Sequence, residues 1–383
     1  MEPVTYAGSG VDVEAGDRAV QLMKASVAGT HGPEVLGGIG GFAGLYDASA
    51  LTGYRRPLLA TSTDGVGTKV AVAQAMGVLD TLGFDLVGMV VDDLVVCGAK
   101  PLFMTDYVVC GRVVPERVAD LVRGIAAACL QAGCALVGGE TAEHPGLLEP
   151  DEFDLAGAAT GVVEAEEVLG PDRVRPGDVL VGLASSGLHS NGYSLIRRVV
   201  EVSGWGLERQ VDEFGRTLGE ELLTPTRVYA ADVLDLVAAT GDRGGPEGSF
   251  RPGVHAVSHV TGGGLAANLA RVIPSGLEAV VDRSTWTPAP VFELLARLGS
   301  VPRPDLERTL NLGVGMVAVV AAERAGDAVG RLAARGVPAW VLGEVREAGD
   351  GPGDTGTADG DVVVRGTKGV DAGAVRMVGR HPG

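Results

Sequence analysis

The sequence predicts an α+β protein with two domains and a C-terminal tail. Its 383 residues are enough for two domains of ordinary size. Short apolar segments typical of strands alternate with helix-like segments in both halves of the chain. The polar segment 173–178, which contains a Pro-Gly pair, separates the halves as a linker would. We therefore expect domains over residues 1–170 and 175–346, followed by an acidic, Gly-rich and loosely ordered tail over 347–383.

Capping residues and apolar runs place the individual elements. Residues 1–57 are Gly-rich and show little periodicity. In the rest of the first half we expect strands over 58–63, 101–109, 135–137 and 155–163, and helices over 69–76, 80–97 and 115–132. In the second half we expect strands over 179–184, 254–260, 277–281, 314–320 and 339–345, and helices over 194–202, 226–239, 291–298 and 325–334, with a further helix after Gly264. Segments 240–253 and 348–360 are predicted to be disordered.

Composition narrows the classes of partner. The formal net charge is 31 − 49 = −18, which opposes binding to nucleic acid or to an anionic membrane. The N-terminus lacks the features of a secretory signal, and no apolar run approaches the ~20 residues that span a bilayer. We therefore expect a cytoplasmic protein. A local basic pocket or a metal ion still allows a small anionic substrate.

The four cysteines lack metal-site spacing and lie in apolar sequence, which predicts buried, reduced thiols.

The segment 64–69, Asp-Gly-Val-Gly-Thr-Lys, lies between a predicted strand and a predicted helix. Gly65 and Gly67 allow a tight turn with exposed N–H groups, while Thr68 and Lys69 offer a hydroxyl and a cation at a helix start, where anions bind well. Asp64 is a suitable ligand for Mg²⁺. The spacing differs from that of a Walker A loop, and an ordinary strand-to-helix turn explains it equally well.

Three aspartates interrupt the apolar helix predicted over 80–97. Asp85 and Asp92 are seven residues apart and project in nearly the same direction, with Asp93 close to that line. Because buried carboxylates without partners are very costly, this pattern favours a cation such as Mg²⁺ bridged to phosphates. A solvated polar stripe on a surface helix is the alternative.

Three further segments combine glycine with polar side chains. Gly138, Gly139, Glu140 and Thr141 follow a predicted short strand, where Glu140 suits a metal or a ribose, although a plain turn at the end of the strand explains this segment better. Segment 185–194 contains Ser186, Gly187, His189, Ser190 and Asn191 ahead of a helix, which suits a phosphate or a polar substrate. Thr261, Gly262, Gly263 and Gly264 form a second candidate phosphate loop.

Taken together and in order, these motifs strongly resemble the phosphoribosylformylglycinamidine cyclo-ligases, also called aminoimidazole ribonucleotide synthetases. The resemblance covers about residues 5–346. Its motifs are the segments 6–12, 33–38, 63–69, 92–95, 98–101, 136–142, 185–194, 223–227, 259–264 and 311–316. The chain departs from the family at Asp92, where Asn is common, and in the longer 240–253 loop and tail.

The resemblance implies an ATP-dependent ligase of purine biosynthesis. Such an enzyme converts formylglycinamidine ribonucleotide and ATP to aminoimidazole ribonucleotide, ADP and phosphate. Asp64, Asp93 and Glu140 would hold Mg²⁺, Lys24 and Lys69 would neutralise phosphate, and His189 would move a proton or hold the substrate. The expected architecture is a homodimer in which the N-terminal sheets of two subunits pair, with ATP near that interface, and the C-terminal domain is an α/β sandwich on the substrate side.

Two other classes of function are compatible with this fold. Thiamine-monophosphate kinase is the nearest enzymatic rival, followed by selenophosphate synthetase and a hydrogenase maturation factor. Segments 185–194 and 259–264 favour the cyclo-ligase. A non-catalytic nucleotide-binding or scaffold protein is the rival from another class, and the intact acidic and basic motif residues oppose it.

Overall fold

The chain folds into two compact units. The computed structural model describes residue 10 and residues 12–242, 250–349, 361–367 and 373–382. The first unit contains residues 1–95, 99–165 and 225–231, and the second contains 96–98, 166–224 and 232–383. Most of the chain thus changes unit close to the predicted linker. The predicted boundaries missed that the segment 225–231 returns to the first unit.

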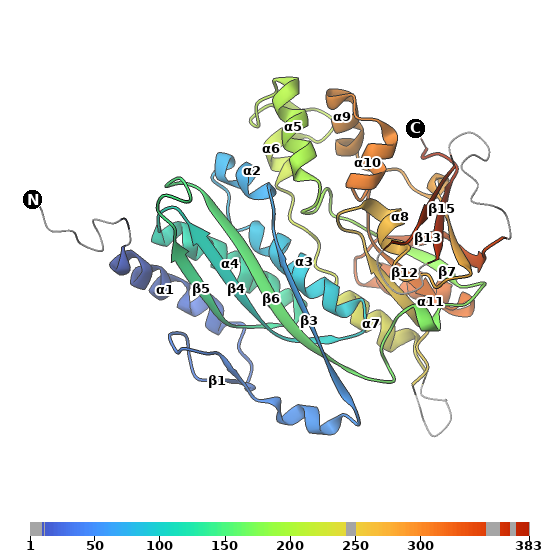
Figure 1. Cartoon of the computed structure of the whole chain (residues 1–383), viewed down its shortest axis with the longest axis horizontal. Coiled ribbons are helices and arrows are strands. Elements are labelled where there is room, and N and C mark those ends of the chain that lie inside the picture. Colours follow the sequence, from blue (N-terminus) through green and yellow to red (C-terminus); the bar gives the residue numbers. More distant parts are fainter. Residues whose placement is uncertain (1–9, 11, 243–249, 350–360, 368–372, 383) are drawn as a thin grey trace, which may run out of the picture. The chain divides into compact units, whose positions relative to one another are not determined.

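A four-stranded sheet covered by two helices forms the centre of the first unit (Figure 1). Its strands run in the order β3-β6-β4-β5, with β6 antiparallel to both neighbours and β4 parallel to β5. The helices α3 and α4 pack together against this sheet, and α1 packs on α4. The elements are α1 (Val13–Ala28), β1 (Val35–Leu36), β2 (Leu45–Tyr46), β3 (Pro57–Gly65), α2 (Lys69–Met76), α3 (Leu82–Val95), β4 (Lys100–Cys110), α4 (Pro115–Ala132), β5 (Ala135–Glu143) and β6 (Phe153–Glu164).

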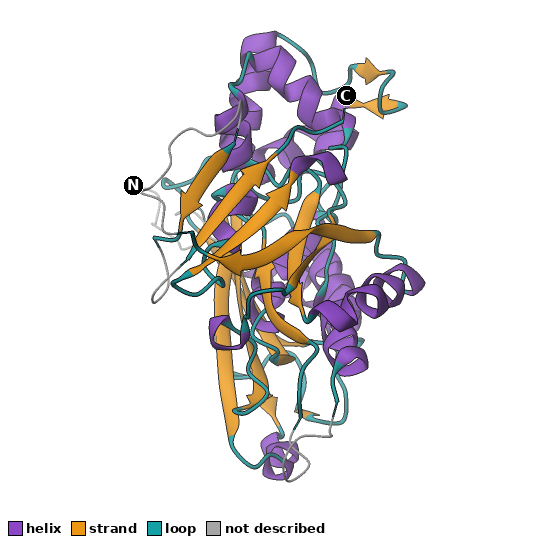
Figure 2. Cartoon of the chain, turned by 90° about the vertical axis from the view of Figure 1, so that its right-hand side faces the viewer, coloured by secondary structure: helices purple, strands orange, loops and turns teal. Residues whose placement is uncertain are grey.

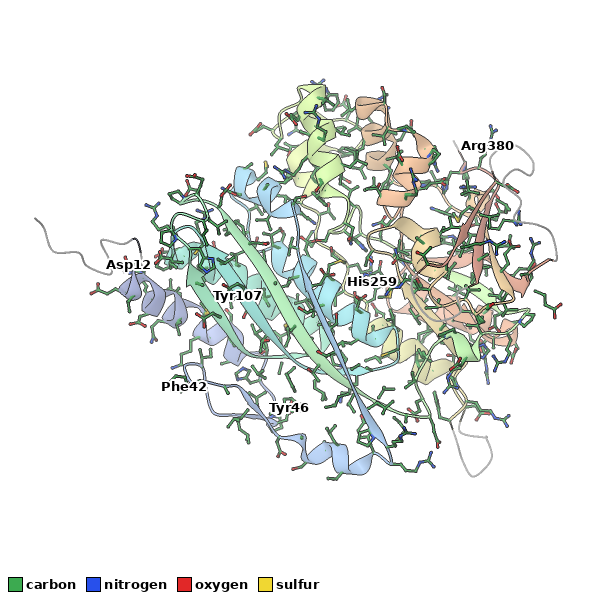
Figure 3. The ribbon with its side chains drawn as sticks, viewed as in Figure 1. Asp12, Phe42, Tyr46, Tyr107, His259 and Arg380 are labelled. Carbon is green, nitrogen blue, oxygen red and sulfur yellow. The ribbon has the colours of Figure 1, made fainter. Side chains whose placement is uncertain are left out.

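One face of this sheet is buried under the helices and the other is exposed. Along β4, Met104 and Val108 are buried, whereas the intervening Thr105 and Tyr107 are exposed. Because side chains alternate between the faces of a strand, these two residues mark the open face. Figure 3 shows the position of Tyr107. We call this surface the open sheet face, defined by Thr63, Thr105, Tyr107, Ala158 and Glu140.

The second unit is built on a seven-stranded sheet with the order β10-β12-β7-β13-β11-β15-β14. Figure 2 distinguishes the strands of the chain from its helices by colour. One face carries a core of buried apolar side chains that includes Leu180, Leu269, Val317 and Val375. The elements are β7 (Val179–Ala184), α5 (Tyr193–Ser203), β8 (Gln210–Val211), β9 (Arg216–Thr217), α6 (Leu218–Leu222), α7 (Ala230–Thr240), β10 (Val254–His259), α8 (Gly264–Leu269), β11 (Leu277–Asp282), α9 (Pro290–Gly299), α10 (Arg303–Thr309), β12 (Val314–Val320), α11 (Ala325–Ala334), β13 (Ala339–Glu347), β14 (Val362–Arg365) and β15 (Ala374–Val378).

Local signals correctly predicted both ends of α4. This helix ends at Gly133, which adopts the left-handed conformation that glycine tolerates best, as does Gly77 at the end of α2. Pro115 occupies the first turn of α4, where its missing N–H costs nothing. None of the helices in the described part of the chain is long and apolar enough to span a bilayer.

The structure differs from the prediction at two elements that were expected, β5 and α7, and it contains helices that were not expected, among them α1 and α10. Helix α1 lies in the region that lacked a clear period, and its N-cap Asp12 accepts a hydrogen bond from the Ala15 N–H at 3.0 Å. Strand β5 continues to Glu143, so the segment 138–141 lies inside a strand. Helix α7 begins four residues later than predicted, at Ala230. Helix α10 was not predicted.

The tail prediction was wrong for two segments. Strands β14 and β15 extend the sheet, and β15 pairs in parallel with β11. Val375 and Met377 of β15 are buried in the core, which explains why an acidic, Gly-rich tail is held there. Residues 350–360, 368–372 and 243–249 lie outside the described residues, as does most of the motif 6–12.

Candidate active site

Segment 64–69 begins at the end of β3 rather than in a loop. Asp64 and Gly65 belong to that strand, and Lys69 is the first residue of α2. Gly67 has φ of +72°, a left-handed conformation that favours glycine at this turn. Asp64, Gly67 and Thr68 are exposed, so their polar groups are accessible to a ligand.

Lys69 does not face solvent with them. Its side chain is fully buried, and its Nζ lies 2.7 Å from Asp85 Oδ1 in an equally buried ion pair. Burial lowers the pKa of Lys69 and raises the pKa of Asp85, and each partner opposes the other's shift. The ammonium group of Lys69, which was predicted to bind phosphate, therefore pairs with the Asp85 carboxylate of α3 in this structure.

The aspartates of α3 hold a distant segment of the same unit. Asp85 Oδ1 also accepts hydrogen bonds from the Thr226 N–H at 3.0 Å and the Thr226 hydroxyl at 2.6 Å. Two turns further along α3, both oxygens of Asp92 accept the Tyr229 N–H at 3.0 Å. Asp93 is exposed. Asp85 and Asp92, seven residues apart, thus each hold one end of the segment 225–231 by hydrogen bonds. The cation that pairs with Asp85 is Lys69 rather than Mg²⁺.

The glycines of β5 have a packing role. A Cβ on Gly139 would lie 1.7 Å from Asp106 Oδ1, so only glycine leaves room for the carboxyl of the neighbouring strand. Burial raises the pKa of Asp106 to about 7. Glu140, the next residue, is exposed, while Gly138 and Thr141 are partly buried.

The three predicted metal ligands are not gathered around one point of the chain. Among the residues that the structure describes, no three His, Cys, Asp or Glu side chains form a metal-binding group. Asp64 lies on β3 and Glu140 on β5, at opposite edges of the four-stranded sheet. Three strand spacings separate these edges by about 14 Å. Asp64 and Glu140 of one chain therefore cannot share a Mg²⁺ ion.

Lys24 is exposed on α1, the helix that packs against α4. Its charge is available to solvent. No described contact joins Lys24 to the segment 64–69.

In the second unit, the motif segments 185–194, 259–264 and 311–316 lie at the same end of three neighbouring strands, β7, β10 and β12. Strand β12 lies between β7 and β10 and is antiparallel to both, so the ends of β7 and β10 meet the start of β12. Asn311, just before β12, joins two of the segments. Its Nδ2 donates to the Gly187 carbonyl at 2.9 Å, and its Oδ1 accepts the Gly313 N–H at 2.8 Å. Asn311 belongs to the motif 311–316, but the sequence alone does not indicate its role.

His189 lies inside this polar cluster and not on its surface. It is 1% exposed, has φ of +60°, and its Nε2 accepts the Ser186 N–H at 3.1 Å. A nitrogen that accepts this bond carries no proton, so the ring is neutral in this arrangement. The geometry is that of a side chain that fixes the segment 185–192, and Ser190 beside it is also buried.

The segment 261–264 is shaped by packing. The Asn268 Nδ2 donates to the carbonyls of Thr261, Gly262 and Gly264 at 3.2, 3.3 and 2.9 Å. A Cβ on Gly264 would lie 1.8 Å from the Glu307 carbonyl oxygen. Because α8 has only six residues, its start offers a weak anion site. The Asn191 carboxamide oxygen lies beside Gly262.

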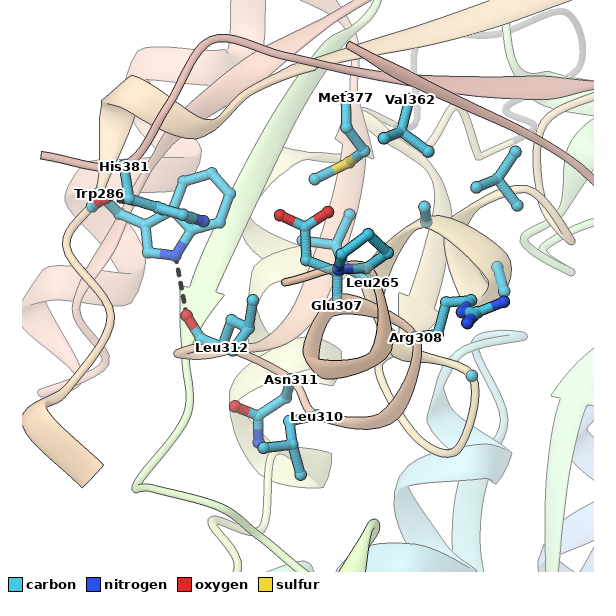
Figure 4. A pocket seen from close by; sticks show the side chains of 15 residues that line it. Leu265, Trp286, Glu307, Arg308, Leu310, Asn311, Leu312, Val362, Met377 and His381 are labelled. Carbon is cyan, nitrogen blue, oxygen red and sulfur yellow. Dashed lines mark hydrogen bonds between the residues drawn. The ribbon is translucent and has the colours of Figure 1, made fainter. Parts of the chain in front are cut away.

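A cavity of about 510 Å³ lies behind this segment in the second unit (Figure 4). Most of its walls are apolar, and the tail strands supply part of them. The His381 ring meets the Trp286 ring edge-on at 4.4 Å, and the Trp286 Nε1 donates to the Leu312 carbonyl at 2.9 Å. The lining residues are Gly263, Leu265, Ala266, Ala267, Trp286, Pro304, Glu307, Arg308, Leu310, Asn311, Leu312, Val362, Val364, Met377 and His381.

Two family descriptions match the chain in order. Residues 46–163 match the N-terminal domain of AIR synthase related proteins, and residues 175–353 match their C-terminal domain. The fold and the two motif clusters thus define a protein of the AIR synthase related class.

Curated relatives narrow this class. The chain is 47% identical to phosphoribosylformylglycinamidine cyclo-ligase of Carboxydothermus hydrogenoformans over 346 residues, which are 90% of this chain and 97% of that protein. It is 48% identical to the enzyme of the same name from Geobacillus kaustophilus over 341 residues, 89% of this chain and 95% of that protein. The chain belongs to the phosphoribosylformylglycinamidine cyclo-ligases, which are ligases that form carbon–nitrogen bonds.

Solved structures with a lower identity share the fold. Thiamine-monophosphate kinase from Stenotrophomonas maltophilia has a TM-score of 0.62 and 19% identity, and the match covers 86% of this chain and 94% of that one. The hydrogenase maturation protein HypE from E. coli has a TM-score of 0.59 and 18% identity, covering 88% and 90%. These matches confirm the predicted two-domain α+β fold.

Proposed function

We propose that this chain closes the imidazole ring of aminoimidazole ribonucleotide, using formylglycinamidine ribonucleotide and ATP and releasing ADP and phosphate. The observation that carries the proposal is the 47% identity to a cyclo-ligase over 90% of the chain, which spans both units. A HypE structure described as a complex with ATP shares the fold with a TM-score of 0.58, which supports a nucleotide as the second reactant.

The chemistry requires an amide oxygen to become a leaving group. Transfer of the γ-phosphoryl group to the formyl amide oxygen gives an imino-phosphate. The amidine nitrogen then attacks that carbon, the ring closes and phosphate leaves with the oxygen. Phosphoryl transfer depends mainly on positioning and on neutralising charge, so the protein has to supply well-placed donors and cations.

We assign the phosphate end of the nucleotide to the exposed turn of the first unit. Gly67 and Thr68 are exposed at this turn, whereas the N–H of Gly65 in β3 donates to Asp64 Oδ1 at 2.8 Å. The neighbouring Asp64 is an exposed carboxylate suited to Mg²⁺. Mg²⁺ in such sites is commonly bound by one or two carboxylates, substrate phosphates and several waters. A single protein carboxylate is therefore enough to bind Mg²⁺ together with the nucleotide. Asp93, Glu140 and Lys24 stay predictions.

We assign the ribonucleotide substrate to the polar cluster of the second unit. Ser186, Gly187 and Asn191 lie on the segment 185–192, which Asn311 and His189 hold in place. His189 acts in this proposal by positioning that segment rather than by carrying a proton.

The proposed active form is a homodimer. The open sheet face of the first unit exposes Thr105 and Tyr107 next to strands whose other face is buried. Pairing this face with the same face of a second chain would bury it, as the family resemblance implies.

One assay tests the reaction. The purified chain is incubated with formylglycinamidine ribonucleotide, ATP and Mg²⁺, and ADP and aminoimidazole ribonucleotide are measured in parallel. We expect the two products in equal amounts. Binding of ATP without substrate-dependent turnover would contradict the proposal. Phosphorylation of thiamine monophosphate in place of ring closure would assign the chain to the rival kinase activity.

A further inference from the structure

The phosphate site lacks Lys69, one of the two cations that the sequence predicted for it. The Lys69 ammonium is fully buried and bonded to Asp85 at 2.7 Å. A nucleotide triphosphate and a 5′-phosphate both bring negative charge that a ligase of this kind has to neutralise. Another positively charged side chain near the segment 64–68 is therefore needed.

The segment 225–231 brings an arginine to the same part of the first unit. The Thr226 N–H and hydroxyl bind the same Asp85 oxygen as Lys69, and Lys69 directly follows Thr68. Arg227 is the next residue after Thr226. The backbone of Arg227 therefore directly follows the residue that shares the Asp85 oxygen with Lys69, the first residue of α2.

This backbone is fixed on both sides of Arg227. Asp85 binds Thr226 before it, and Asp92 binds the Tyr229 N–H after it. Gly88 of α3 permits the close approach, because a Cβ there would lie 2.7 Å from Thr226 Cγ2. The two buried aspartates of α3 therefore hold Arg227 in a defined place, as a binding residue requires.

The guanidinium itself has an unused donor. Arg227 Nε is buried and, among the described residues, has no hydrogen-bond partner. Leaving a charged donor buried without an acceptor is costly, which is a reason to expect an anion at this place in the working enzyme. Guanidinium groups match the geometry of phosphate oxygens and form two parallel bonds with them.

We propose that Arg227 binds a phosphate group of a reactant and supplies the positive charge that Lys69 does not. The phosphate belongs either to the nucleotide or to the ribose 5′-position of the other substrate. The inference rests on the proposed function, because that reaction brings both phosphates to the protein.

The test compares Arg227→Met and Arg227→Lys with Arg123→Gln. Arg123 is an exposed arginine of α4 that pairs with Asp120 on the same helix, so its loss controls for the removal of a charge from the first unit. KM and kcat are measured with ATP and with formylglycinamidine ribonucleotide varied in turn. Binding of ADP and of formylglycinamidine ribonucleotide is measured by titration calorimetry, and folding by urea unfolding.

Loss of a hydrogen bond to a charged group predicts a rise of about 10- to 100-fold in one KM and the matching Kd for Arg227→Met. Arg227→Lys should recover part of it, and Arg123→Gln should behave as wild type. A rise confined to ATP and ADP assigns the nucleotide phosphates, and a rise confined to the ribonucleotide assigns its 5′-phosphate.

Two results would overturn the inference. One is an Arg227→Met variant with wild-type KM and Kd for both reactants. The other is a variant whose only defect is a lower urea midpoint, which would make Arg227 a structural residue. If the wild-type chain forms no aminoimidazole ribonucleotide, the proposed function fails, whereas the two binding titrations still decide the role of Arg227.

Discussion

At the scale of single residues, the ion pair between Lys69 and Asp85 is the most consequential contact that the sequence did not reveal. Both side chains are fully buried. Lys69→Met would leave the Asp85 carboxylate buried with only its two Thr226 hydrogen bonds. We expect a loss of about 3–5 kcal/mol in the free energy of unfolding. Urea unfolding measures it, and a double variant that adds Asp85→Leu should recover part of the loss. An unchanged midpoint in Lys69→Met would contradict this view of the pair.

His189 illustrates how position changes a predicted role. A proton-transfer residue would shape the pH dependence of kcat, whereas a residue that fixes a loop would not. Because Nε2 accepts the Ser186 N–H, we expect His189→Ala to lower kcat about 10-fold or more while the pH profile keeps its shape. The measurement is kcat from pH 6 to 9 for both proteins. Disappearance of one limb of the profile in the variant would restore the acid–base role.

Asp106 should make stability depend on pH. Its pKa is raised by burial to about 7 in the folded chain, against 3.8 for an exposed carboxyl. Folding therefore favours the protonated form, and the cost of burying the charge is absent below pH 4 and complete above pH 7. The nearby thiol of Cys129 does not titrate in this window, because its pKa is raised well above 9.

The comparison of wild type with Asp106→Asn isolates this effect. The variant's free energy of unfolding relative to wild type should rise by roughly 1 kcal/mol per pH unit between pH 4 and 7 and then level off. Urea unfolding at several pH values provides the numbers. A difference that stays constant over this range would show that Asp106 is ionised throughout.

At the scale of elements, the sequence correctly predicted helix ends that depend on the residues at those ends. The bounds of α4 followed from Pro115 in its first turn and Gly133 after its end. The prediction failed where distant contacts decide. The residues just before α7 have helix-like sequence, yet Asp85 and Asp92 bind the N–H groups of Thr226 and Tyr229 and keep this segment out of the helix. The glycines of β5 are typical of a turn in the sequence alone. In the structure they lie in a strand, and Gly139 leaves room for the carboxyl of Asp106 on the neighbouring strand.

The crossing of α3 and α4 gives the prediction that belongs to this scale. A Cβ on Gly83 of α3 would lie 2.0 Å from the Gly124 carbonyl carbon of α4, so the two backbones touch. Alanine raises helix propensity by about 1 kcal/mol, but this clash with backbone should outweigh it and give a net loss of about 2 kcal/mol or more.

Gly16 of α1 is the matched control, because a Cβ there meets nothing within 4 Å. Thermal or urea unfolding should show Gly83→Ala to be less stable than wild type and Gly16→Ala to be slightly more stable. Equal stabilisation by both substitutions would mean that the helices are not in close contact.

At the scale of the whole molecule, the order of the motifs was more informative than any single motif. Segment 64–69 alone was equally compatible with a turn, and the segment 261–264 is now explained by packing against Asn268 and Glu307. The ordered series nevertheless identified the family, because chance does not place ten motifs in sequence across two units. What it could not provide is the pairing of side chains across the fold. For that reason the sequence places Lys69 at the phosphate and assigns no role to Arg227, although Arg227 belongs to the motif 223–227.

Assembly is the remaining property at this scale, and it depends on the open sheet face. Thr105 is exposed on β4, between the buried Met104 and Asp106. If two chains pair through this face, Thr105→Lys places two like charges in a buried interface and should shift the protein from dimer to monomer with loss of ring-closing activity. Sedimentation velocity gives the mass, and Arg123→Glu on the exposed side of α4 serves as the control. A Thr105→Lys protein that sediments as the wild-type dimer would place the interface elsewhere, and a monomeric, active wild type would remove the need for one.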